Sequence, residues 1–295
     1  MLPAMSHPDG LGLGTLALVA LGLGLLAAPA PARATWSIVA IDPATREVGA
    51  AGASCILGSE VIAVVVPDHG AAVSQAMTNS DARLKLREAL TSGEPPAQAL
   101  GEVTTRWFDS FLGAPTVNLR QYGAVSLAAP DEPASFTGTW TASWGGSESA
   151  RGVSVQGNTL VGPEVVAGAL AAFEGEGRGC RPRLADRLMA ALLAGSAAGG
   201  DKRCVPELSA LSAFLIVAEP DDPLDAPSLH LVRNRPGQPP WSLWQEIRNA
   251  MRPVPGSPEE NPVGLLRRAY EEHADGSGAP ACLPAPRADG ASLPD

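Results

Sequence analysis

Short apolar segments separated by turn residues begin after residue 34, and they predict a series of β-strands. Residues Trp36–Ile41 alternate loosely and contain several β-branched side chains, and Asp42–Thr45 has the composition of a turn. Glu47–Ser54 is rich in Gly and Ala, which is typical of a strand that other backbone approaches closely. Two further strands are expected at Val61–Val66 and Ala71–Ala76. The folded part of the chain is therefore expected to open with a meander of short strands.

The apolar spacing becomes helical after Ser80, and blocks of strand-like and helical spacing then alternate along the chain. The predicted helices are Ala82–Leu90, Pro95 to about Phe108, Pro163–Phe173, Arg183–Ala194 and Trp241–Met251. The later predicted strands are Gln121–Ala128, Ala134–Trp140, Gly152–Asn158, Leu211–Ala218 and Leu229–Val232. Because strands and helices come in separate blocks, the order favours α+β layers over a repeated βαβ unit. Two antiparallel sheets with helices outside them fit this order.

Composition divides the chain into three parts. Residues 1–34 have the form of a signal peptide, with an apolar run at Leu11–Ala28 and small residues after it. Residues 35–251 hold most of the predicted elements, and residues 252–295 form a Pro- and Gly-rich tail in which one short helix is expected at Val263–His273. The leader predicts export, to the periplasm or out of the cell.

The leader leaves two points open. At ~18 residues its apolar run is about long enough to cross a bilayer, so an uncleaved anchor is the alternative to a cleaved leader. Small residues permit cleavage after Ala30, Ala32 or Ala34. Cleavage after Ala34 places Thr35 first, directly before the first predicted strand. No stable membrane insertion is expected once the leader is removed.

The net charge limits the classes of partner that are expected, and the cysteines bear on disulfide formation. The formal net charge is −10 and no basic run occurs, which argues against nucleic acid and anionic membranes as partners. In an oxidising compartment the four cysteines predict one or two disulfides, with buried free thiols as the alternative. Their three pairings are left open by the sequence. We expect neither a metal nor a cofactor, because there is no C-x-x-C and the His residues are scattered. The cysteines are Cys55, Cys180, Cys204 and Cys282.

Standard catalytic motifs are missing, and this draws attention to the residue that follows the leader. There is no phosphate-binding loop, no H-E-x-x-H and no G-x-S-x-G, and His69 and His230 lie in a predicted turn and strand. An N-terminal threonine needs no histidine, because its own α-amino group can take the proton from its hydroxyl. With a reference pKa of about 7.7–8.0, part of that amine is neutral near neutral pH. Thr35 is therefore a candidate nucleophile.

Several segments carry a resemblance to a bacterial family catalogued as domain of unknown function 1028. The opening TWSIVAIDP at Thr35–Pro43 is similar to the start of that family. The other similar segments are Val48–Ser54, Gly70–Asn79, Tyr122–Ala128, Val155–Pro163, Ala194–Asp201 and Trp241–Ala250. The resemblance implies membership of the N-terminal nucleophile hydrolase superfamily, whose fold is a four-layer αββα sandwich of two antiparallel sheets flanked by helices. It also implies that Thr35 is the nucleophile once the leader is removed.

Polar residues at the matched positions are the candidates that support Thr35. Ser54 is expected to face Thr35 from the next strand, and Asp201 to orient its amine or to cap a turn beside Cys204. The candidate groups for binding substrate or an oxyanion are Gln75, Asn79, Gln156 and Asn158. Three of them have a plain alternative, since Asn79 suits a helix cap and Gln156 and Asn158 suit a turn. One departure is that no Lys or Arg lies between Arg46 and Arg83 to tune the amine, and Cys55 stands where the family commonly has a basic residue.

Two functions remain after these observations. The first is an exported amide-bond hydrolase, acting on a small-molecule or peptide amide, that uses Thr35 as nucleophile. The second is a non-catalytic secreted domain of the same fold that binds a ligand or partner. The placement of Thr35 after the leader favours the first, and the missing lysine favours the second. The substrate and a homo-oligomeric state are left open.

Overall fold

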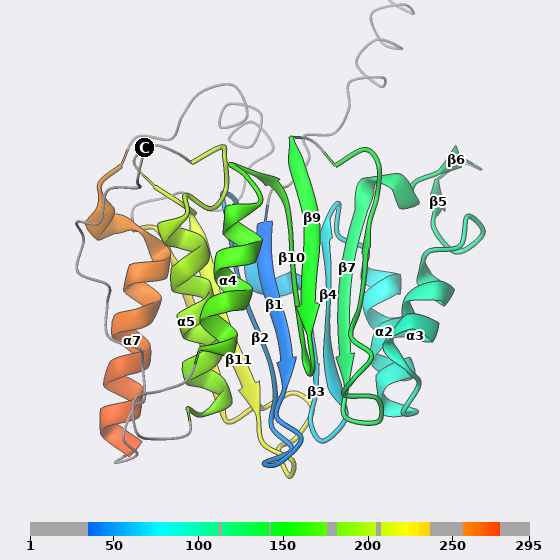
Figure 1. Cartoon of the computed structure of the whole chain (residues 1–295), viewed down its shortest axis with the longest axis horizontal. Helices are drawn as coiled ribbons and strands as arrows, with labels where there is room; N and C mark the ends of the chain where they lie inside the picture. Colours follow the sequence, from blue (N-terminus) through cyan, green and yellow to red (C-terminus); the bar gives the residue numbers. More distant parts are fainter. Residues whose placement is uncertain are drawn as a thin grey trace, which may run out of the picture. The chain divides into compact units, whose positions relative to one another are not determined.

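The computed structural model describes residues 35–111, 114–141, 143–175, 182–204, 208–236 and 256–277. These residues form an α+β fold with two antiparallel sheets (Figure 1). The larger sheet has the strand order β12-β11-β2-β1-β10-β9. Its strands are β1 (Thr35–Ile41), β2 (Val48–Ser54), β9 (Trp144–Ala150), β10 (Val153–Leu160), β11 (Ser212–Ala218) and β12 (Leu229–Asn234). The strand that begins at Thr35 therefore lies inside the sheet, with a partner on each side.

The smaller sheet has the order β3-β4-β7-β8, and a short ladder β5-β6 stands apart from it. Its strands are β3 (Ala63–Val66), β4 (Gly70–Ala76), β7 (Arg120–Ser126) and β8 (Ala134–Thr137), and the ladder joins β5 (Ser110–Phe111) to β6 (Ala114–Pro115). The helices are α2 (Ser80–Thr91), α3 (Pro96–Val103), α4 (Glu164–Glu174), α5 (Leu184–Ala197) and α7 (Pro262–Ser277), with single 3-10 turns η1 (Ser59–Ile62), η2 (Val117–Leu119) and η3 (Pro258–Glu260).

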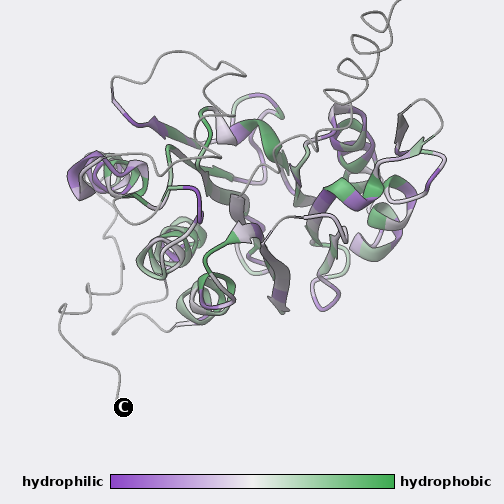
Figure 2. Ribbon diagram, turned by 90° about the horizontal axis from the view of Figure 1, so that it is seen from above, coloured by the Kyte–Doolittle hydropathy of each residue, from purple (hydrophilic) through white to green (hydrophobic). Residues whose placement is uncertain are grey.

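Helices cover one face of each sheet, and strand alternation decides which residues they cover. In β1, Trp36 and Ile38 point toward α4 and α5, and join their buried side chains in one apolar cluster. Helices α2 and α3 pack in the same way on the smaller sheet, where Tyr122 and Ala124 of β7 contribute to a second cluster. Seen end-on in Figure 2, helices lie on either side and the strands lie between them. The two remaining sheet faces meet each other.

The layer between the sheets changes character along the strands. At the end away from Thr35 it is apolar and contains Val39 and Ile41 of β1, Val73 of β4 and Ile216 of β11. At the Thr35 end the same alternation places polar side chains on the inner faces, and they are buried. They are Thr35, Ser37, Ser54, Gln75, Gln121, Ser154, Gln156 and Asn158. A buried polar layer has to be satisfied internally, and this makes it the natural place to look for a site.

Most predicted elements are present, and several differ in extent from the prediction. The expected strand at Val61–Val66 begins as the 3-10 turn η1, so only β3 remains extended. The second helix ends at Val103 rather than near Phe108, and β8 ends at Thr137 rather than at Trp140. Strand β10 continues to Leu160, so Gln156 and Asn158 lie within a strand and not in a corner. The predicted helix Trp241–Met251 lies outside the described residues.

The helix expected at Val263–His273 is present as the longer α7, and it packs on the domain. Val263, Leu266 and Tyr270 are buried in the cluster under α4 and α5. The Tyr270 hydroxyl donates to Asp186 Oδ1 of α5 (2.6 Å) and accepts from Arg183 Nη2 (3.1 Å). Burial, followed by the hydrogen bond and charge of Asp186, raises the pKa of this hydroxyl, so it stays a donor. The contact fixes α7 to α5.

We expect Tyr270→Phe to lower the free energy of unfolding by roughly 1–3 kcal/mol, because the buried Asp186 carboxylate loses a donor. Urea unfolding followed by circular dichroism measures this loss. Arg267→Ala on the same helix is the matched control, since it removes only the half-exposed Arg267–Glu271 pair and should cost under about 0.5 kcal/mol. Equal stability of Tyr270→Phe and the parent would contradict the role given to this hydroxyl.

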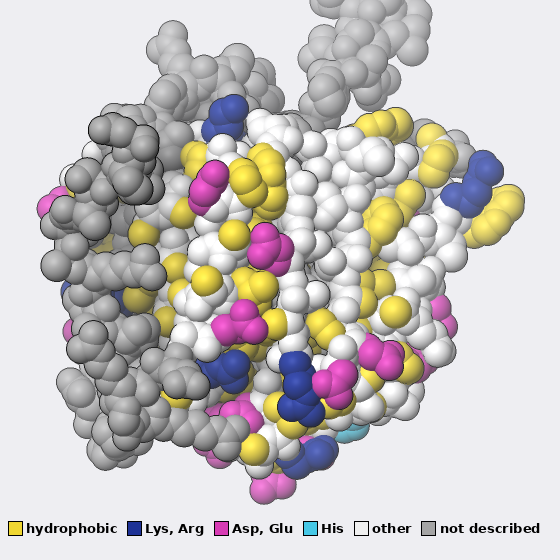
Figure 3. Space-filling model, viewed as in Figure 1, with side chains coloured by type: hydrophobic (Ala, Val, Ile, Leu, Met, Phe, Trp, Pro, Cys, Tyr) yellow, Lys and Arg dark blue, Asp and Glu magenta, His cyan; other side chains and the backbone are white. Residues whose placement is uncertain are grey.

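The charged side chains on the surface are distributed as the acidic composition and the lack of a basic run in the sequence predict. On the face shown in Figure 3, acidic side chains are interspersed with Lys and Arg, and no basic cluster is seen there. Among the helices in the described ranges, none combines the length and apolar character needed to cross a bilayer.

Candidate functional site

Thr35 occupies the N-terminal end of the central strand β1. It pairs with Ser54 of β2 on one side and with Asn158 of β10 on the other, and its side chain is buried. Its Oγ1 donates to Ser54 Oγ at 3.2 Å. The peptide groups of Ser54 face β11, because Leu211 N donates to Ser54 O (2.7 Å), so Thr35 and Ser54 form the closer, non-hydrogen-bonded kind of cross-strand pair. This geometry brings the two hydroxyls together at the end of the strand.

Glutamine side chains form a floor beneath this end of β1. Ser37 Oγ donates to Gln75 Oε1 (2.7 Å), and Gln156 Nε2 donates to Ser37 Oγ (2.7 Å) and to its carbonyl (3.0 Å). Ser154 Oγ donates to Gln156 Oε1 (2.8 Å). Each amide thereby has a fixed orientation. Gln75 and Gln156, proposed from sequence as substrate-binding groups, are committed to partners within the layer.

Gln121 completes the floor, although sequence reasoning had not singled it out. Its Oε1 accepts from Gln75 Nε2 (2.7 Å) and Asn158 Nδ2 (3.1 Å), and its Nε2 donates to Gly157 O (2.8 Å). The signal was available, because alternation along the predicted strand Gln121–Ala128 places Gln121 on the same face as Gly123 and Val125. The floor is a continuous network linking both sheets under Thr35.

The close approach of the sheets at this network requires a glycine. A Cβ added to Gly123 of β7 would lie 2.0 Å from Gln156 Oε1. We expect Gly123→Ala to cost about 1–3 kcal/mol in unfolding free energy, because the held glutamine has to be displaced. Thermal and urea unfolding check this. Gly168→Ala in α4, where a Cβ meets nothing within 4 Å, is the control and is expected to be neutral or stabilising. A stable Gly123→Ala variant would show that Gln156 is free to move.

Asn79 lies in a different role from the floor residues. It is half-buried and caps α2, since its Oδ1 accepts from Asp81 N (3.0 Å) and Ala82 N (3.2 Å). The helix-cap alternative considered for this residue therefore describes its observed contacts.

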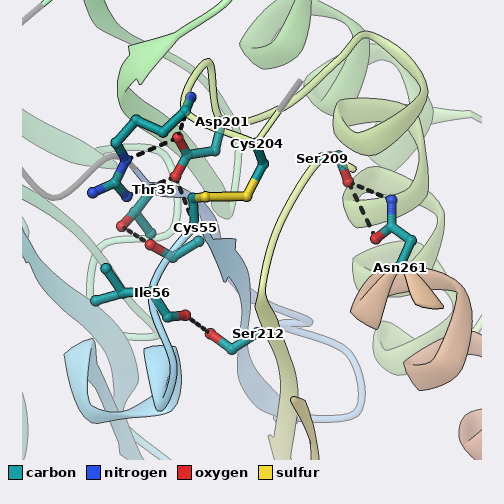
Figure 4. The surroundings of a disulfide bond; sticks show 10 residues. Thr35, Cys55, Ile56, Asp201, Cys204, Ser209, Ser212 and Asn261 are labelled. Carbon is teal, nitrogen blue, oxygen red and sulfur yellow. Dashed lines mark hydrogen bonds and ion pairs between the residues drawn. A yellow bond between two sulfur atoms is a disulfide. The ribbon is translucent and has the colours of Figure 1, made fainter. Parts of the chain in front are cut away.

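Asp201 approaches the site from the segment after α5. It is fully buried, and its Oδ2 accepts from Cys55 N at 2.6 Å. Arg203 forms an ion pair with it, with Nη2 2.8 Å from Oδ2 and Nε 3.1 Å from Oδ1. The Cys55–Cys204 disulfide joins the same two segments (Figure 4). One of the pairings left open by the sequence is thus present, and it adjoins Ser54; Cys180 and Cys282 lie outside the described residues.

Glycines and Trp36 fix the turn that carries Asp201. Gly199 and Gly200 have φ of +103° and +61°, values that favour glycine. A Cβ on Gly200 would lie 2.7 Å from the Trp36 ring, and one on Gly195 would lie 2.5 Å from Trp36 Nε1. The residue next to Thr35 therefore packs directly against the turn that delivers Asp201.

Two strained residues flank the site. Ala76, directly after Gln75, has φ of +67°, and Thr159, directly after Asn158, has φ of +53°. Such values are rare for residues other than Gly, Asn and Asp, and a β-branched Thr is a particular outlier. At Thr159 the register between β10 and β9 also shifts. Backbone strain of this kind clusters at functional sites, where the surrounding structure holds it in place.

Comparisons with known proteins agree on one family. The model of a family of unknown function, DUF1028, matches residues 35–239. The fold is similar to the crystal structure of a DUF1028 protein from Silicibacter pomeroyi, with a TM-score of 0.58 and 24% sequence identity, over 82% of this chain and 89% of that one. At this identity the likeness concerns the fold alone. Among curated proteins, none matches the chain.

Proposed function

The chain belongs to the DUF1028 family, and from this premise we propose that it is an exported amide-bond hydrolase whose nucleophile is Thr35, freed when residues 1–34 are removed. The observation that carries the proposal is the position of Thr35. It begins a central strand, its hydroxyl is held by Ser54, and a polar network supports it from below.

The arrangement of layers supports a place in the N-terminal nucleophile hydrolase superfamily. Helices α4, α5 and α7 cover the outer face of the larger sheet, and α2 and α3 cover that of the smaller one. The inner faces of the sheets meet in a shared layer. This order supports the proposal of a four-layer αββα sandwich, in which the nucleophile would stand at a strand end between the sheets.

The proposed reaction needs groups that a freed Thr35 supplies itself. Its Oγ1 attacks the carbonyl carbon of an amide while the α-amine accepts the hydroxyl proton. The proton passes to the leaving amine as the C–N bond breaks, which leaves an ester between the acyl group and Thr35. Water then attacks the carbonyl carbon of this ester while the amine accepts a proton from the water. The bond between the acyl carbon and Oγ1 breaks, the amine returns the proton to Oγ1, and the acyl group leaves as a carboxylic acid. Ser54 orients Oγ1, and Gln75, Gln121 and Gln156 act as positioning residues because their amides are engaged within the floor.

A second candidate function is a secreted domain that binds a ligand without catalysis. It is favoured by the commitment of the glutamine amides to one another, and by the lack of Lys or Arg between Arg46 and Arg83. In this case the end of β1 would serve as a rigid binding surface.

Intact-mass measurement of the exported protein tests the proposal. We expect a mature chain that begins at Thr35. The disulfide Cys55–Cys204 is compatible with an oxidising compartment, and it should be present in the same sample. In a mature chain that begins at Arg33, or in one that retains the leader, the Thr35 nitrogen stays in a peptide bond. Either result would overturn the proposal of a hydrolase.

A further inference from the structure

The ion pair between Asp201 and Arg203 lies at the α-nitrogen end of Thr35. In the register of β1 and β2, Thr35 pairs with Ser54, so Cys55 lies one step beyond it at that end. The peptide groups of Ser54 face β11, and by alternation those of Cys55 face β1. Since Cys55 N donates to Asp201 Oδ2 (2.6 Å), the carboxylate lies on the β1 side of Cys55.

The pairing of β1 with β10, on its other side, also places Asp201 at the α-nitrogen end of Thr35. Asn158 of β10 pairs with Thr35, and Leu160, two residues further along, forms an isolated antiparallel bridge with Asp201. The backbone bridge of Leu160 therefore places Asp201 at this end of β1, and the contact with Cys55 N places its carboxylate where the amine of a freed Thr35 would be exposed. Figure 4 shows Thr35, Cys55 and Asp201 converging there.

We propose that Arg203 is a positioning residue that neutralises Asp201 beside the Thr35 α-amine and so keeps that amine in its basic form. This inference rests on the proposed function. Asp201 alone would hold the amine as an ammonium ion, because an opposite charge within about 4–6 Å favours the charged form. The guanidinium of Arg203 contacts both carboxylate oxygens and is itself about nine-tenths buried, so little water screens the pair.

Other charged groups around this end are few in the described residues. Strands β1, β2, β4 and β10 carry no charged side chain, and Arg120 of β7 is engaged by Asp109 (2.8 Å). Lys202 is exposed on the turn, and Glu60 lies in η1 beyond Cys55. The Asp201–Arg203 pair is thus the ionic group that contacts the segment at the α-nitrogen end, and changing either partner changes the field there.

The two partners predict opposite effects. Arg203→Gln leaves the Asp201 charge uncompensated and should raise the pKa of the Thr35 amine by about one pH unit. Asp201→Asn keeps an acceptor for Cys55 N but leaves the cation, and should lower the amine pKa by a similar amount. The double variant should return close to the parent, and Arg203→Lys should shift less than Arg203→Gln.

Periodate oxidation measures this amine without any substrate. It cleaves the Cα–Cβ bond of an N-terminal threonine and requires the unprotonated amine, so the rate against pH reports the amine pKa. The chain 35–295 is released from an N-terminal fusion by a protease that leaves Thr35 as the first residue. Intact mass then follows the periodate cleavage of the Thr35 Cα–Cβ bond over time. Thr35→Val lacks the hydroxyl and serves as the unreactive control.

Opposite shifts in Arg203→Gln and Asp201→Asn, with return in the double variant, support the proposal. Unchanged midpoints of the pH profiles, or shifts of the same sign in the two variants, overturn the proposal. Circular dichroism shows whether each variant is folded. If Arg203→Gln does not fold, the amine pKa of Arg203→Lys is compared with that of Asp201→Asn, and opposite shifts of the two support the proposal. Because the readout needs neither export nor catalysis, the hydrolase proposal can fail on its mass test while this one stands.

Discussion

Alanine at position 35 is expected to abolish covalent labelling of the mature protein by an electrophile directed at N-terminal threonine. The labelled bond forms at Thr35 Oγ1, and alanine has no hydroxyl to donate. In the parent the neighbouring amine supplies the base, so labelling should rise with pH through the amine pKa, whose reference is about 7.7–8.0. Intact mass after a fixed exposure measures the labelled fraction.

Two variants make this result specific to the site. Thr35→Ser keeps a hydroxyl on the same amine and should still be labelled. Ser54→Ala removes the partner of Oγ1 at 3.2 Å and should slow labelling without abolishing it, because the amine remains. Equal labelling of Thr35→Ala and the parent would place the reactive group elsewhere. No labelling of the parent, in a chain that begins at Thr35, would favour the binding function.

The second large effect is expected from the disulfide. It joins residues separated by 149 positions, and cross-linking so long a segment restricts the unfolded chain strongly. Replacing both cysteines by Ala should therefore lower the free energy of unfolding by roughly 3–5 kcal/mol. Alanine is preferable to serine because both sites are buried, and a hydroxyl there would need a partner. Urea unfolding, with the midpoint and slope fitted together, measures the change.

Single variants separate the cross-link from local packing. Cys55→Ala and Cys204→Ala each break the same bond, so each should lose about as much stability as the double variant. Losses that add would indicate two independent packing effects, and a total under about 1 kcal/mol would contradict the role of the cross-link. Periodate profiles of the same proteins should also change, since the bond holds the turn that carries Asp201 beside Cys55.

The limits predicted from the sequence were most accurate for strands that are buried on both faces. Strands β1, β2 and β11 are apolar or small throughout because both faces are covered, and their predicted limits agree with the structure to within one residue. Strand β9 was missed, because WGGSESA pairs only with β10 at an edge and needs few apolar residues. The helix after Pro95 was extended too far because Trp107 continues its apolar spacing, yet this side chain is 86% exposed.

The candidate site was predictable only where contacts are local. The pairing of Thr35 with Ser54 follows from a hairpin that turns at Asp42–Thr45, so the two residues meet once the turn is placed. The contact between Cys55 and Asp201 spans 146 positions, and no local pattern gives it. Alternation along the predicted strand places Gln121 on the inner face, but its contacts with Gln75 of the neighbouring strand β4 and with Asn158 of the larger sheet appear only once both sheets are placed. Arg203 required the buried carboxylate to be known first.

The position of β1 has a consequence for local unfolding. Chain ends ordinarily fray, and their amide hydrogens exchange quickly with solvent. Strand β1 pairs with β2 and β10 on its two sides from Thr35 onward, so its end opens only when one of these strands separates. Its amides should therefore exchange as slowly as those of the domain centre. A chain cut before Thr35 would carry a terminus that remains in register through the fluctuations that release ordinary chain ends.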